Sequence, residues 1–112
     1  MNNQEKLEKI RKIIKDAKLK QVERNGYKNY VVHVTLTDGK EIDIRVKNYE
    51  LEALVEDAGV DNFVVNFEIR VSKETNNEFE CFVISLPAIN YELLAFPSRE
   101  VMAMLNLRIL KK

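Results

Sequence analysis

Two short turn signals, Asn25-Gly26 and Asp38-Gly39, constrain the fold of this sequence more than any other feature. Asparagine or aspartate followed by glycine favours the two-residue turn of a β-hairpin, because both turn positions need a positive φ angle. The flanking segments alternate between apolar and polar residues, which is typical of strands with one buried face. We therefore expect an antiparallel meander. Residues 19–24 either join it as a strand or prolong the first helix, and the Asn-Gly turn favours the strand.

Two further strands are expected over residues 63–71 and 78–86. The first alternates between apolar and polar residues, which predicts one buried and one solvated face. The second is apolar on both faces, so it is expected to be a central strand that is covered on both sides. After this strand we expect a short helix from Tyr91 to Phe96, which begins at an Asn90 cap and ends before Pro97.

Apolar residues recur at helical spacing in three other segments, which are residues 3–18, 49–58 and 99–105. Asn2 or Asn3 can cap the first of these helices. Asn48 can cap the second, and Gly59 supplies its C-terminal stop. Residues 105–112 could either continue the last helix or form a final strand.

The expected fold class is α+β, with an N-terminal helix followed by two β-hairpin-plus-helix (ββα) units. These units would form a mainly antiparallel sheet with helices packed on one face, within a single domain of residues 1–112. A short repeat supports two units, because Asn48-Tyr49-Glu50-Leu51 reappears as Asn90-Tyr91-Glu92-Leu93. An internal duplication would relate residues 27–58 to residues 62–96. Ordinary helix-start chemistry could also produce this repeat by coincidence, and both explanations stay open.

The side chains that most enzymes use for nucleophilic or metal chemistry are scarce. Cys81 is the only cysteine and His33 the only histidine. Cys81 lies in an apolar strand, whereas His33 lies on the polar side of another, so a thiol–imidazole pair is not expected. A zinc site lacks its usual ligands, and no glycine-rich phosphate loop is present. We therefore expect no catalytic residue, no metal and no cofactor.

The sequence also indicates where the protein resides. A single cysteine excludes an intramolecular disulfide, which is typical of reduced compartments. No apolar run approaches the roughly 20 residues that span a bilayer, and the N-terminal segment is unlike a signal peptide. We expect a cytoplasmic protein that does not enter a membrane.

The formal net charge of zero conceals three segments of opposite sign. Residues 1–29 hold nine Lys/Arg and four Asp/Glu, residues 30–97 hold five and thirteen, and residues 98–112 hold four and one. A neutral total argues against a purely electrostatic nucleic-acid binder, which usually has a basic excess. The opposite charges of the segments could instead serve recognition of a partner.

The leading hypothesis is a non-enzymatic binding module that acts through a protein partner. Its candidate contacts are four acidic residues of the 49–58 helix, Glu50, Glu52, Glu56 and Asp57. The complementary segments also fit a homodimer. We identify no family motif. The Lys, Asn, Ile and Glu usage is typical of an AT-rich genome. Small neutral α+β chains without catalytic groups are common among accessory and inhibitor proteins of phages and mobile elements.

The alternative hypothesis is single-stranded nucleic-acid binding through the basic N-terminal region. Its candidate contacts are Arg11, Lys15, Lys18, Lys20 and Arg24. Tyr27 and Tyr30 lie nearby in the sequence, and aromatic side chains beside basic grooves can stack on unpaired bases. The alternation of strand residues, however, points Tyr30 towards the core. A solvated face is the simpler explanation for the lysines.

Overall fold

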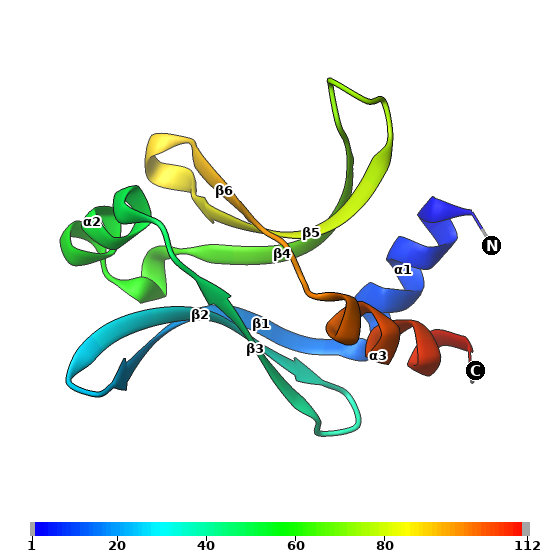
Figure 1. The fold of residues 1–112 in the computed structure, drawn as a ribbon, viewed down its shortest axis with the longest axis horizontal. Coiled ribbons are helices and arrows are strands. Elements are labelled where there is room, and N and C mark those ends of the chain that lie inside the picture. The colour runs from blue at the N-terminus through cyan, green and yellow to red at the C-terminus, as the bar shows by residue number, and fades with distance from the viewer. Residues whose placement is uncertain (1, 111–112) are drawn as a thin grey trace.

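The computed structural model describes residues 2–110, which form three α-helices and six β-strands (Figure 1). The helices are α1 (Asn3–Ile13), α2 (Tyr49–Ala58) and α3 (Arg99–Leu110). The strands are β1 (Ile14–Arg24), β2 (Tyr27–Leu36), β3 (Glu41–Val46), β4 (Val64–Val71), β5 (Glu78–Leu86) and β6 (Tyr91–Ala95). Two single-turn 3-10 helices, η1 (Val60–Asn62) and η2 (Pro87–Ile89), complete the chain. The predicted α+β class is confirmed.

The strands form two three-stranded antiparallel sheets that enclose one hydrophobic core. Sheet A has the order β1-β2-β3 and sheet B the order β4-β5-β6; sheet A lies below sheet B in Figure 1. The middle strand of each sheet supplies fully buried side chains, Val32 from β2 and Phe82 and Ile84 from β5. Each sheet precedes a helix, α2 or α3, so the predicted hairpin-plus-helix units are present in outline, each with a third strand.

The helices close the ends of this two-sheet arrangement. In Figure 1, α2 lies at the end where the β1–β2 turn projects, and α1 and α3 lie at the opposite end. Leu51 of α2, Ile10 of α1 and Leu105 of α3 are each 0% exposed, so every helix contributes to the same core. Within residues 2–110, no helix is both long enough and apolar enough to cross a membrane.

The first helix is shorter than predicted. α1 ends at Ile13, and the next residue begins β1, which pairs with β2 from Ile14↔Leu36 to Arg24↔Tyr27. The expected helix over residues 3–18 was therefore wrong for residues 14–18, whereas the predicted strand over residues 19–24 is confirmed. The physical reason is that β2 is long and largely buried, and its backbone N–H and C=O groups need partners along their whole length.

The short helix predicted from Tyr91 to Phe96 is also wrong, because Tyr91–Ala95 forms strand β6. Asn90 does not act as an N-cap. It adopts a left-handed conformation with φ 55° and ends the turn that Pro87 begins. This reversal lets β6 pair with β5 from Leu86↔Tyr91 to Phe82↔Ala95. The pairing makes β5 the central strand of sheet B, as its apolar pattern predicts.

The Asp38-Gly39 signal forms a hairpin but not the predicted two-residue turn. The Leu36 N–H donates to the Lys40 carbonyl oxygen at 2.8 Å, so three residues connect β2 to β3, and of Asp38 and Gly39 only the glycine has a positive φ angle, 92°.

Other local signals act as expected. Asn25 and Gly26 have φ angles of 53° and 79°, which a two-residue hairpin turn requires. The Asn48 side chain accepts a hydrogen bond of 2.9 Å from the Leu51 N–H and caps α2. The last helix continues to Leu110, which answers the question that the sequence left open for residues 105–110. Residues 111 and 112 lie outside the described part of the chain.

Candidate nucleic-acid interface

The outer face of sheet A, turned away from sheet B, brings together part of the predicted basic set. Alternate strand residues share a face. The register therefore gives this face Lys18, Lys20, Val22 and Arg24 of β1, Tyr27, Asn29, Val31 and His33 of β2, and Asp43 and Arg45 of β3. In Figure 1, the three helices lie beyond its ends or on the other side of the sheet, so the face is open.

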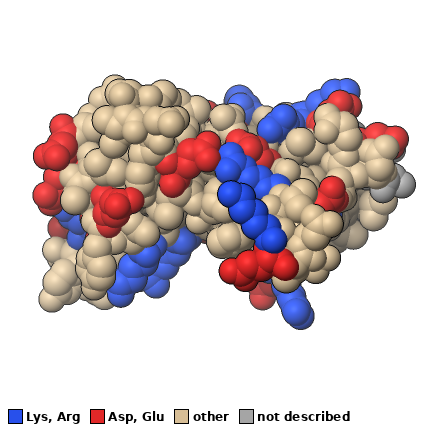
Figure 2. Space-filling model, turned by 90° about the horizontal axis from the view of Figure 1, so that it is seen from above, with Lys and Arg blue, Asp and Glu red and all other residues tan. Residues whose placement is uncertain are grey.

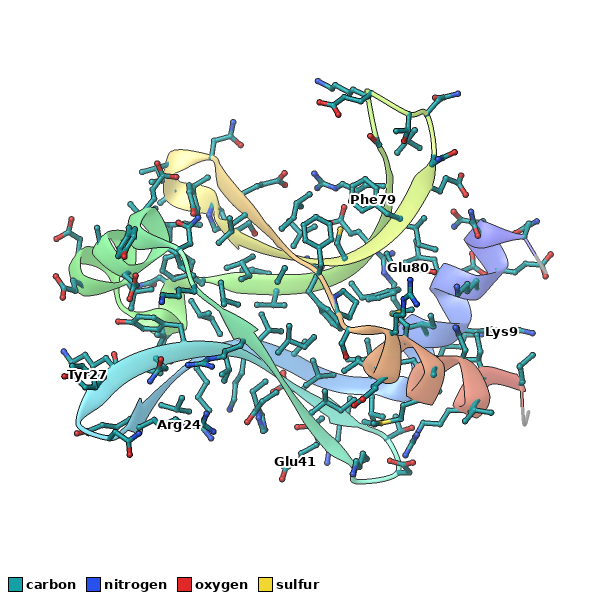
Figure 3. All side chains as sticks on the ribbon, in the orientation of Figure 1. Lys9, Arg24, Tyr27, Glu41, Phe79 and Glu80 are labelled. Atoms are coloured by element: carbon teal, nitrogen blue, oxygen red, sulfur yellow. The ribbon has the colours of Figure 1, made fainter. Side chains whose placement is uncertain are left out.

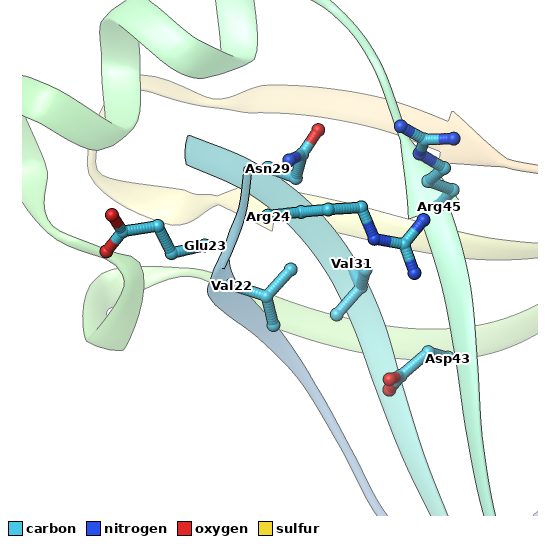
Figure 4. A pocket seen from close by; sticks show the side chains of 7 residues that line it. All are labelled: Val22, Glu23, Arg24, Asn29, Val31, Asp43 and Arg45. Atoms are coloured by element: carbon cyan, nitrogen blue, oxygen red, sulfur yellow. The ribbon is translucent and has the colours of Figure 1, made fainter. Parts of the chain in front are cut away.

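A pocket of about 350 Å³ lies on this face near the β1–β2 turn (Figure 4). It is lined by Val22, Glu23, Arg24, Asn29, Val31, Asp43 and Arg45. In Figure 4, the guanidinium groups of Arg24 and Arg45 extend towards the same region, whereas Glu23 points to the other side of its strand. The ion pairs formed within residues 2–110 include neither arginine. Their donors are therefore available to a ligand.

A second pocket of about 390 Å³ continues the first around the end of the sheet. Arg24, Asn29 and Arg45 line both pockets, and the second adds Asn25, Tyr27, Lys28, Tyr30, Val46, Lys47 and Glu52. Figure 3 shows Tyr27 at the extreme end of the molecule and Arg24 on the underside of sheet A. Tyr27 is 74% exposed, which leaves its ring free to stack. The turn end of the face thus combines cations, amides and an aromatic ring.

The other half of the face carries carboxylates beside its histidine. His33 Nδ1 lies 2.6 Å from Asp43 Oδ1, and His33 Nε2 lies 3.2 Å from Glu41 Oε1. Asp43 lines the pocket but His33 does not, so the histidine lies outside the pocket. The basic part of the face is therefore its turn end, around Lys20, Arg24 and Arg45.

The predicted basic residues divide into two groups. Lys18, Lys20 and Arg24 share the outer face of sheet A, but Arg11 and Lys15 lie at a shallow pocket between β1 and β4. Arg11 Nε donates a hydrogen bond of 2.9 Å to the Phe67 carbonyl oxygen, so it ties α1 to sheet B. The sequence-based set lacked Arg45, whose position on the polar side of an alternating strand was the signal that could have found it.

The four acidic candidates all belong to α2 but have different surroundings. Glu52 is half-buried and lines the second pocket together with Lys28 and Lys47, whereas Glu50, Glu56 and Asp57 are exposed. Burial raises the pKa of Tyr30, and the nearby carboxylates of Glu56 and Glu52 raise it further. Two of the four therefore face the end of sheet A and balance part of its positive charge.

The outer face of sheet B differs in that its arginine is paired. Arg70 Nε donates to Glu68 at 3.0 Å, and Arg70 Nη1 and Nη2 donate to the two carboxylate oxygens of Glu92 at 3.0 and 3.2 Å. Hydrogen bonds to Glu92 and Glu68 raise the pKa of Arg70, and the same contact lowers the pKa of Glu92. Figure 2, which views the molecule from this side, shows acidic and basic side chains interleaved rather than separated.

The surfaces offer little for covalent or metal chemistry. Cys81 is 0% exposed on sheet B, where burial raises the pKa of its thiol, and His33 belongs to the other sheet. The described residues contain no group of three or more His, Cys, Asp or Glu side chains that could hold a metal ion. Comparison with models of known protein families, with curated protein sequences and with solved structures found no match.

Proposed function

We propose that the protein is a non-enzymatic binding module for single-stranded nucleic acid, with the turn end of the outer face of sheet A as its contact surface. The observation that carries the proposal is the position of Arg24 and Arg45 in one open pocket, without an ion-pair partner among residues 2–110. Lys20 lies on the same face, opposite Val31. Two arginines therefore line the pocket, and a lysine lies on the same face beside it.

The arrangement provides for both parts of a nucleotide. Lysine and arginine side chains bind phosphates and release counterions, which supplies sequence-independent affinity. The exposed ring of Tyr27 can stack on a base, and the amide of Asn29 can hydrogen-bond to a base edge. Alternate residues of β1 are separated by about 6.6 Å, twice the strand rise of about 3.3 Å. This spacing lets successive cations follow an extended backbone across the sheet.

The neutral net charge of the chain is compatible with this function, because the contact surface is local. If Lys18, Lys20, Arg24 and Arg45 each neutralise one phosphate, the logarithm of the binding constant should fall with the logarithm of salt concentration at a slope of about −3. Binding should therefore be weak at physiological salt and clear at low salt. Duplex nucleic acid should bind less well, because its paired bases are unavailable for stacking on Tyr27.

The test is fluorescence anisotropy with labelled single-stranded DNA and RNA at low salt, with a duplex of the same sequence for comparison. The triple variant Lys20→Glu, Arg24→Glu, Arg45→Glu should lose at least tenfold in affinity. A matched control changes the same charge elsewhere, as Lys9→Glu, Lys12→Glu, Lys73→Glu, all at exposed positions. The control should lose less than threefold. Absence of binding by the unmodified protein, or equal losses in both triple variants, would overturn the proposal.

A second candidate function, a protein contact through α2, is favoured by Tyr49. This ring is 85% exposed at the start of a helix that also carries the exposed carboxylates of Glu50 and Asp57, and an exposed aromatic residue is a common anchor of interfaces. The partner of such an accessory protein would present a basic surface, or would be a second copy of the chain. Tyr49→Ala should then abolish capture of a purified partner, or dissociate a dimer in analytical ultracentrifugation, without changing nucleic-acid affinity. Unchanged association would remove α2 from consideration.

A further inference from the structure

We infer that the pocket between Arg24 and Arg45 holds the terminal phosphate of a nucleic-acid strand, an inference that rests on the proposed function. Guanidinium groups bind phosphate oxygens through paired N–H donors, which gives geometric as well as electrostatic recognition. Both arginines line the pocket, together with the amide-bearing side chain of Asn29. The site therefore offers several donors to one group of oxygens.

The number of acceptor oxygens favours a terminal phosphate over one in the strand interior. A phosphate monoester offers three terminal oxygens to the two guanidinium groups, whereas a phosphodiester in the strand offers only two. Glu23 also lines the pocket, but its side chain points to the other side of its strand (Figure 4). Asp43 also lines the pocket, but its Oδ1 lies 2.6 Å from His33 Nδ1, an existing contact that faces the imidazole. Val22 and Val31 supply the apolar part of the lining.

The position of the pocket also suits the end of a strand. Arg24 is the last residue of β1 and the chain then reverses at Asn25 and Gly26, so the row of cations along β1 stops there. A strand that follows Lys18 and Lys20 along β1 reaches the pocket at the edge of the molecule, where Tyr27 is exposed. Its terminal phosphate would enter the pocket, and its first base would lie within reach of Tyr27.

The experiment compares three oligonucleotides of one sequence, with a 5′-phosphate, a 3′-phosphate or hydroxyl groups at both ends. The unmodified protein should bind one phosphorylated strand at least tenfold more tightly than the hydroxyl-terminated strand. Arg45→Lys and Arg24→Lys keep the positive charge but lose the paired donors. They should reduce this preference to less than threefold. Arg99→Lys, at an exposed position of α3, serves as the matched control.

An NMR titration with inorganic phosphate, against sodium chloride of equal ionic strength, separates failure of this inference from failure of the proposed function. Phosphate should shift the Nε–H signals of Arg24 and Arg45 selectively. If strands bind but phosphate causes no selective shift and the three oligonucleotides bind equally, the phosphate pocket is overturned and nucleic-acid binding stands. If no strand binds, both the proposed nucleic-acid binding and the recognition of a terminal phosphate are overturned. This conclusion holds even if inorganic phosphate shifts the arginine signals.

Discussion

Sheets A and B are both three-stranded meanders with arginine on the outer face, yet the surroundings of these arginines differ. On sheet B, Arg70 donates to Glu68 and to both oxygens of Glu92. On sheet A, Arg24 and Arg45 share a pocket without an ion-pair partner in the described chain. A paired guanidinium has used its donors within the protein. An unpaired one keeps them for a ligand, and this difference distinguishes a structural face from a candidate binding face.

The residues beneath the arginines strengthen the contrast. Outer-face positions of β5 bury Cys81 and Val83 at 0% and 2% exposure, and the rings of Phe79 and Phe96 lie 5.7 Å apart. Sheet B therefore covers its outer face largely with its own side chains. Sheet A buries Val31 in the same way, but leaves pockets beside it.

The largest expected effect is on the free energy of unfolding, and it tests the hydrophobic core that the two sheets share. Phe82 of β5 is 0% exposed, and its ring meets that of Phe67 edge-on with centroids 5.1 Å apart. Phe82→Ala should lower the free energy of unfolding by about 3–5 kcal/mol, through lost burial and the cavity left behind. Urea unfolding measures this change. Since one core joins the sheets, hydrogen exchange should quicken in β2 as well as in β5.

The control for this prediction stays on the same sheet. Val64 of β4 is 44% exposed, so Val64→Ala should cost less than about 1 kcal/mol. Retained protection of β2 amides in Phe82→Ala would show that the sheets are independently stable, and would contradict the shared core.

A smaller effect distinguishes the two asparagines that begin the copies of the repeated Asn-Tyr-Glu-Leu segment. Asn48 caps α2 with its side chain, whereas Asn90 adopts a left-handed backbone before β6. Serine caps helices about as well as asparagine, so Asn48→Ser should change the free energy of unfolding by only a few tenths of a kcal/mol. Serine tolerates the left-handed region poorly, and Asn90→Ser should cost about 1 kcal/mol. Thermal unfolding of both variants provides the measurement; equal responses would show that the two sites are not distinct.

The smallest effect concerns pH and the paired arginine. The pKa of Glu92 lies below its ordinary value of 4.5 because Arg70 donates hydrogen bonds to the carboxylate. A carboxyl group with a lowered folded pKa contributes stability above its unfolded pKa, and this contribution is lost as pH falls through the folded pKa. Arg70→Ala should raise the pKa of Glu92 towards 4.5. The free energy of unfolding should then fall less steeply as the pH is lowered below 4.5 (the acid limb) than it does in the unmodified protein. NMR titration of the Glu92 side chain measures the pKa directly.

Sheet A supplies the control. Arg45→Ala should leave the pKa of Glu92 and the acid limb unchanged, because Arg45 belongs to the other sheet. The difference between wild type and Arg70→Ala should shrink in high salt, since exposed charges are screened. Identical acid limbs in wild type and Arg70→Ala would mean that the pair has no energetic role.

Much of the fold was predictable because its signals are local. Alternation located β4, a run that is apolar on both faces located β5, and the Asn25-Gly26 turn located the first hairpin. The candidate site was only partly predictable. Lys18, Lys20 and Arg24 were among the basic candidates, but Arg45 joins them through the register Lys20↔Val31↔Arg45 across three strands. The Asn25-Gly26 turn fixes the β1–β2 part of this register, but the β2–β3 part depends on a connection one residue longer than the two-residue turn that Asp38-Gly39 predicts.

The repeated tetrapeptide shows what the sequence determined and what the tertiary structure determined. Asn-Tyr-Glu-Leu at residues 48–51 begins a helix, and the same four residues at 90–93 lead into a strand. By itself the sequence determined that a polar, turn-prone asparagine follows the end of a strand at both places. Only the tertiary structure decided between helix and strand for the residues after each asparagine. Beyond β5, the Pro87 turn places Tyr91 opposite Leu86, and the unpaired edge of β5 gains a hydrogen-bonding partner. The partner on a neighbouring strand outweighs local helix preference, because a buried backbone must have its hydrogen bonds satisfied.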